Sequence, residues 1–106
     1  LHAGQIQGFF DMPVDEMSAM PITANYFLEK RLQRPVVVSP DLGNTKRCRN
    51  FAEILDAPLA IIEKRRMGNQ DKSEVLNLIG SVEGCQVVIV DDEIDTAGSI
   101  TQAADV

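Results

Sequence analysis

Two acids and a hydroxyl-rich turn follow a short apolar run near residue 90, and this spacing suits a sugar phosphate. Residues 87–90 are apolar and β-branched, which predicts a buried parallel strand. Asp91 and Asp92 follow at the carboxyl end of that strand, where open α/β sheets place their ligands. Residues 95–99 then form a small turn that opens a helix and presents N–H groups and two hydroxyls to an anion. Carboxylates for sugar hydroxyls or a cation, followed by a phosphate cradle, indicate a sugar-phosphate site. The alternative is a strand end with a solvated acidic pair.

A second predicted strand, residues 35–39, ends in a similar way. Asp41 follows it and can ligate a magnesium ion directly or through water. A turn at residues 43–45 leads into a helix and can receive another phosphate group. Taken alone, Asp41 is more typical of a strand-end residue that caps the next helix. Two such edges in one sheet favour a ligand that carries a pyrophosphate group.

Three cations, Lys64, Arg65 and Arg66, follow a third predicted strand at residues 58–62. Such cations can neutralise charge on transferring phosphoryl oxygens, Lys as a point charge and Arg as a planar fork. The alternative is a solvated basic loop. Because the neighbouring strands end in acids, we favour a functional role.

Strands and helices alternate along the chain. The predicted helices cover residues 21–34 and 45–55. Their buried side chains are expected to be Ile22, Tyr26, Phe27 and Leu32 in the first helix, and Phe51, Ile54 and Leu55 in the second. Further strands are expected at residues 5–10 and 74–80, and a mobile loop at residues 63–73. This alternation predicts an α/β fold with a parallel sheet flanked by helices.

The composition excludes several classes of function. The 106 residues suit one domain with a modest core, and 44% are hydrophobic and 25% charged. A net charge of −6 argues against nucleic acid, and no apolar run approaches the ~20 residues of a membrane span. Cys48 and Cys85 lack CxxC spacing, so we expect reduced structural thiols in a cytoplasmic protein. Because the chain starts without Met and stops inside an apparent helix, we expect a piece of something longer.

Several segments resemble those of one enzyme family. The run from residue 87 to residue 101 resembles the phosphoribosyl pyrophosphate (PRPP) binding loop of phosphoribosyltransferases and ribose-phosphate pyrophosphokinases. The segment at residues 2–15, HAGQIQGFFDMPVD, resembles a signature of the pyrophosphokinases that phosphoribosyltransferases lack. The Lys64-Arg65-Arg66 run resembles the mobile catalytic loop of the pyrophosphokinases. The chain is therefore identified, by resemblance, as a member of the ribose-phosphate pyrophosphokinase family.

That resemblance implies a type I phosphoribosyltransferase-like domain and a reaction. The family transfers the diphosphoryl group of ATP to the 1-hydroxyl of ribose 5-phosphate, which gives PRPP and AMP, with Mg2+ as cofactor. His2 and Asp41 would be metal ligands, Lys64 the main catalytic cation, and Arg66 a catalytic and ribose 5-phosphate-binding residue. The remaining ribose 5-phosphate residues would be Asp91, Asp92, Asp95, Thr96, Ala97, Gly98 and Ser99. The pyrophosphate loop would be Asp41, Leu42, Gly43, Asn44 and Thr45.

The resemblance also implies an organisation. Residues 1–20 would end a first domain and connect it to a second domain, of which residues 21–106 form most. Homodimers that assemble into hexamers are expected. Asn44 stands where the family commonly has a second Gly, and Asn tolerates left-handed backbone angles better than most residues. Two alternatives stay open: a non-catalytic regulatory relative, and a phosphoribosyltransferase that consumes PRPP.

Overall fold

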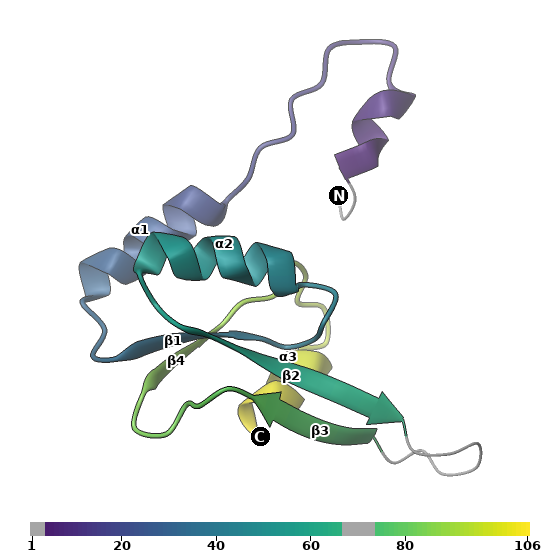
Figure 1. Cartoon of the computed structure of the whole chain (residues 1–106). Helices are drawn as coiled ribbons and strands as arrows, with labels where there is room; N and C mark the ends of the chain where they lie inside the picture. Colours follow the sequence, from purple (N-terminus) through teal and green to yellow (C-terminus); the bar gives the residue numbers. More distant parts are fainter. Residues whose placement is uncertain (1–3, 67–73) are drawn as a thin grey trace.

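A single four-stranded sheet organises the chain in the computed structural model, which describes residues 4–66 and 74–106 (Figure 1). The sheet has the strand order β3-β2-β1-β4. The elements, in chain order, are the 3-10 helix η1 (Gly4–Phe9), α1 (Met20–Lys30), β1 (Pro35–Ser39), α2 (Thr45–Leu55), β2 (Leu59–Arg66), β3 (Glu74–Ile79), β4 (Gln86–Ile89) and α3 (Gly98–Ala104). The predicted α/β fold class is confirmed.

The central strand, β1, is parallel to both of its neighbours. Val38 pairs with Ala60 of β2 on one side and with Ile89 of β4 on the other. The carboxyl ends of three strands therefore share one edge of the sheet, as predicted. β3 runs antiparallel to β2, with Lys64 opposite Leu76. Only seven residues separate these two strands in the sequence, which is too short for the crossover that a parallel pair needs.

Helices cover both faces of the sheet (Figure 1). α1 and α2 pack on one face and α3 on the other. The first face buries Ala24, Val37, Cys48, Phe51, Ala52, Leu55 and Val88. The second face buries Val36, Val38, Ala60, Ile62 and Ala103. Because successive side chains of β1 alternate between faces, its three valines serve both cores, and this strand is the centre of the domain.

The helices bury a narrower stripe than predicted. α1 ends at Lys30 because Arg31 adopts a left-handed conformation (φ 50°). Ile22 is 77% exposed and Tyr26 53% exposed, while Ala24 is the buried residue of α1. Phe27 and Leu32 pack against the core, as predicted.

α2 has the predicted bounds. Its buried residues are Cys48, Phe51, Ala52 and Leu55, which is the i, i+3, i+4, i+7 pattern of one helix face. Ile54 falls outside that stripe and is 40% exposed, so its predicted place in the core is wrong.

Two further local predictions are also wrong. Residues 5–10 were expected to form a strand, but η1 forms there, with the Gln7 amide donating to the Gly4 carbonyl (3.1 Å) and to Glu16 (2.9 Å). A strand needs a neighbour, and this segment has none among the described residues. The expected loop at residues 63–73 begins too early, since β2 continues to Arg66 by pairing with β3. The rest of that loop, residues 67–73, lies outside the described residues.

The remaining global predictions concern thiols and membranes. Cys48 is a buried free thiol and Cys85 a half-buried one, in agreement with the prediction of reduced cysteines. Within residues 4–66 and 74–106, no helix is long and apolar enough to cross a membrane.

Candidate functional site

The carboxyl edge of β2, β1 and β4 gathers the predicted acids and one predicted cation. Asp41 follows β1, Asp91 follows β4, and Lys64 lies on the part of β2 that extends beyond the end of β1. Because β1 lies between the other two strands, the three segments meet at this edge. Their charges interact across it, since the Asp41 carboxylate raises the pKa of Asp91 and the Lys64 ammonium lowers it. The structure therefore brings Asp41, Asp91 and Lys64 together.

The loop after β1 is closed by its own polar groups. The Ser39 hydroxyl donates to the Asp41 carbonyl at 2.7 Å. The Asp41 carboxylate accepts the Asn44 N–H at 2.9 Å, so Asp41 does order the start of the next helix. Asn44 has φ −92° and ψ 1°, so the left-handed conformation considered for it is not adopted. Gly43 is exposed, and the Thr45 hydroxyl donates to the Leu42 carbonyl at 2.9 Å.

The loop after β4 surrounds a hollow of about 280 Å3 lined by residues 91–100. The Asp91 carboxylate accepts the Asp92 N–H at 2.9 Å, which orients the start of the loop. Ala97 adopts a left-handed conformation (φ 62°) immediately before α3, a strained geometry for a residue with a Cβ. Asp95, Thr96 and Ser99 are exposed around the hollow, as a cradle for an external anion requires.

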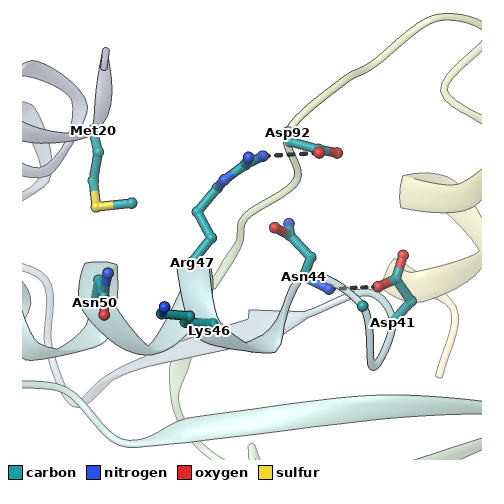
Figure 2. A pocket seen from close by; sticks show the side chains of 8 residues that line it. Met20, Asp41, Asn44, Lys46, Arg47, Asn50 and Asp92 are labelled. Atoms are coloured by element: carbon teal, nitrogen blue, oxygen red, sulfur yellow. Dashed lines mark hydrogen bonds and ion pairs between the residues drawn. The ribbon is translucent and has the colours of Figure 1, made fainter. Parts of the chain in front are cut away.

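A larger pocket of about 600 Å3 opens between the two loops (Figure 2). Its wall combines both loops with the first turns of α2 and the start of α1. The lining residues are Met20, Asp41, Gly43, Asn44, Lys46, Arg47, Asn50 and Asp92. Figure 2 shows Arg47 reaching across the pocket to Asp92, where its guanidinium lies 2.8 Å from the carboxylate.

Sequence reasoning missed Lys46, Arg47 and Asn50 as pocket residues. One signal was available for the two cations. Positive side chains in the first turn of a helix oppose the helix dipole, so their presence there calls for a reason beyond helix stability. For Arg47 the reason is an ion-pair partner across the pocket, the Asp92 carboxylate.

The electrostatics of the edge centre on Asp91. Burial raises the pKa of the Asp91 carboxyl above its usual value, and the neighbouring Asp41 carboxylate raises it further. The charges of Lys64 and Arg47 act in the opposite direction and lower it. Two mutually repelling carboxylates therefore lie beside two cations from different elements. This is an arrangement that a bound cation would stabilise.

The predicted metal ligands are His2 and Asp41. Among residues 4–66 and 74–106, no three side chains of His, Cys, Asp or Glu gather in a way that could hold a metal ion. His2, the other predicted ligand, lies outside the described residues. The side chain of Arg66 is likewise outside the description, although its backbone pairs with Glu74.

The comparisons with known proteins agree with this geometry. Residues 10–106 match the family model described as "Phosphoribosyl transferase domain". A ribose-phosphate pyrophosphokinase from Fusobacterium nucleatum is 57% identical over 107 residues, which cover 99% of this chain and 34% of the relative. The crystal structure of phosphoribosylpyrophosphate synthetase from Mycobacterium smegmatis matches with a TM-score of 0.83 and 38% identity, over 99% of this chain and 33% of that one.

A more distant structure shares the fold alone. Purine phosphoribosyltransferase from Pyrococcus horikoshii matches with a TM-score of 0.64 and 22% identity, over 82% of this chain and 58% of that one. The chain spans about a third of the length of the pyrophosphokinase relatives. The chain therefore belongs to the phosphoribosyl transferase domain family, and within it resembles the ribose-phosphate pyrophosphokinases.

Proposed function

We propose that this chain is part of an enzyme that transfers the diphosphoryl group of ATP to the 1-hydroxyl of ribose 5-phosphate. The observation that carries the proposal is the meeting of Asp41, Asp91 and Lys64 at one sheet edge, between two loops suited to phosphate groups. The hydroxyl oxygen attacks the β-phosphorus, and the bond from that phosphorus to the α-phosphate bridging oxygen breaks. The products are PRPP and AMP, and the hydroxyl proton is lost to solvent.

Residues 91–99 are proposed to hold ribose 5-phosphate. Asp91 and Asp92 accept hydrogen bonds from the ribose hydroxyls, which fixes the ring. The 5-phosphate lies in the hollow formed by Asp95, Thr96, Ala97, Gly98 and Ser99, where hydroxyls and backbone N–H groups can donate to it. Holding the sugar at both ends aligns its 1-hydroxyl for in-line attack.

The diphosphoryl group is proposed to lie on the pocket side of the same edge. Residues 41–45 receive the pyrophosphate moiety against the exposed turn at Gly43. Lys64, on the overhang of β2, stabilises the negative charge that builds on the transferring group. Arg66, two residues further along β2, assists it and helps to bind ribose 5-phosphate, since its fork matches paired phosphate oxygens.

The carboxylates fit a magnesium ion. Asp41 offers hard oxygen donors, and a cation bound there would relieve its repulsion of the neighbouring Asp91 carboxylate. Mg2+ is commonly bound by one or two carboxylates together with substrate phosphates, so the site would not need three protein ligands. We assign Asp41 and His2 as its protein ligands. When bound, the ion supplies charge neutralisation to the phosphate oxygens.

The proposal extends to the organisation of the protein. Residues 1–20 belong to, or join, a first domain, and residues 21–106 form most of a second. The full-length subunits assemble as homodimers and then as hexamers. The two free thiols agree with a reducing, cytoplasmic location.

The experiment that tests this function is phosphorus NMR of the full-length protein with ATP, magnesium and ribose 5-phosphate. The proposal expects PRPP and AMP to appear together in equal amounts. A folded, oligomeric protein that leaves ATP untouched would instead be a regulatory relative. A protein that leaves ATP untouched but releases pyrophosphate from PRPP in the presence of a nucleobase would be a phosphoribosyltransferase.

A further inference from the structure

The carbonyl of Val90 is held by two side chains from the start of α2. The Asn44 amide donates to it at 3.2 Å, and the Cys48 thiol donates to it at 3.2 Å. Asn44 and Cys48 lie one helical turn apart and are both buried. Val90 directly precedes Asp91. The position at which the chain leaves β4 and presents its acids therefore depends on α2.

Asn44 is bonded to both loops of the site. Its backbone N–H donates to the Asp41 carboxylate at 2.9 Å, while its side-chain amide reaches Val90. Its backbone angles (φ −92°, ψ 1°) are those of the third residue of a type I turn, here residues 42–45, which most residues can adopt, so the main chain places no special demand on this position. The specific contribution of Asn44 is its side chain, which can donate where glycine or alanine cannot.

The neighbouring contacts strengthen the same connection. Arg47, in the same turn of α2, pairs with Asp92 at 2.8 Å (Figure 2). Val90 and Asp92, the residues on either side of Asp91, are thus each anchored to the start of α2. Ordering of the loop after β1 therefore also restricts the loop after β4.

We propose that Asn44 is a positioning residue that couples the two ligand loops, so that a diphosphate bound at residues 41–45 orders Asp91 and Asp92 for the ribose. This inference rests on the proposed function and deepens it. Besides its place in the loop that receives the diphosphate, Asn44 acts on the second loop through its bonds to Asp41 and Val90. A ligand that orders one loop spares the second ligand part of the entropic cost of binding, which is positive cooperativity.

The test is the binding of ribose 5-phosphate to the full-length protein by calorimetry, without and with magnesium and α,β-methylene-ATP, which cannot transfer its diphosphoryl group. In the wild-type protein the analogue should tighten ribose 5-phosphate binding. In Asn44→Ala about fivefold of that tightening should be lost, the equivalent of one buried hydrogen bond. Asn44→Asp should lose it too, since a carboxylate cannot donate to the Val90 carbonyl. Asn77→Ala, which removes an exposed amide from β3, is the matched control and should keep it.

A second measurement needs no variant. In the wild-type protein, the analogue alone should slow amide hydrogen exchange at Asp91 and Asp92. Unchanged exchange there, or full cooperativity in Asn44→Ala, would overturn the proposal, and so would a variant whose melting temperature falls while its cooperativity stays. If cooperative binding is observed but no PRPP is formed, the coupling stands and the proposed activity fails.

Discussion

Gly80, the residue after β3, should resist any side chain. It has φ +117°, a backbone conformation that L residues rarely adopt. A Cβ built on it would lie 2.9 Å from the Cβ of Ala60 and 3.2 Å from its Cα. Ala60, the second residue of β2, is 1% exposed, so it has no room to move away. The lack of a side chain at Gly80 therefore lets the chain after β3 lie close to the start of β2 at Ala60. The same hairpin carries Lys64.

Gly80→Ala should weaken the hairpin substantially. Backbone strain of this kind costs about 1–3 kcal/mol, and overpacking of a tight site costs about as much again. We take about 3 kcal/mol for the sum, which corresponds to roughly a hundredfold change in an opening equilibrium. Gly8→Ala is the matched control, because a Cβ there meets nothing within 4 Å.

The assay is hydrogen exchange of the full-length protein, followed in peptides that span β2 and β3. Exchange in Gly80→Ala should be faster by about two orders of magnitude in these strands, while Gly8→Ala matches the wild type. Equal exchange in Gly80→Ala and Gly8→Ala would show that the close approach to Ala60 does not hold the hairpin.

Four further predictions concern the core and the pocket. Burial raises the pKa of the Cys48 thiol, so at pH 8 iodoacetamide should modify Cys85 well before Cys48; equal rates would contradict the buried position of Cys48. Because the fold favours the protonated Cys48 thiol, this thiol stabilises the fold at pH values below its pKa in the unfolded chain. The stabilisation is lost as the pH rises through the pKa of the thiol in the folded protein. The free energy of unfolding of Cys48→Ala, measured against pH, should therefore lack this decrease. A double-mutant cycle on Arg47 and Asp92, both partly exposed, should give a coupling of about 0.2–1 kcal/mol in urea unfolding, and a value several-fold higher would refute a screened pair. Phe51→Ala should cost about 3–5 kcal/mol in the same assay, because Phe51 is 2% exposed, and a cost below about 1 kcal/mol would place it outside the core.

Elements with strong local signals could be predicted from the sequence. β1 and α2 have the predicted bounds, because an apolar β-branched run and a helical stripe are properties of the segment itself. The length of β2 could not be predicted, since residues 63–66 are polar and become a strand only through β3. η1 was missed for the converse reason: a strand-like pattern formed no strand without a partner.

The candidate site divides in the same way. The meeting of Asp41, Asp91 and Lys64 could be predicted, because parallel strands bring their carboxyl ends to one edge. The bond from Asn44 to Val90 joins residues 46 positions apart and depends on how α2 packs on β4. No local pattern carries that information, so the connection between the two loops is visible only in the structure.

The most direct test of the central claim is the kcat of Lys64→Ala for PRPP formation in the full-length protein, with Lys30→Ala as control. Lys30 is an exposed cation on α1 that lies over the Tyr26 ring, so its loss removes the same charge away from the sheet edge. If Lys64 stabilises the transferring group, kcat should fall by about 10²–10³-fold in Lys64→Ala and stay at the wild-type value in Lys30→Ala. Wild-type kcat in Lys64→Ala would contradict the assignment of this edge as the place where the diphosphoryl group is transferred.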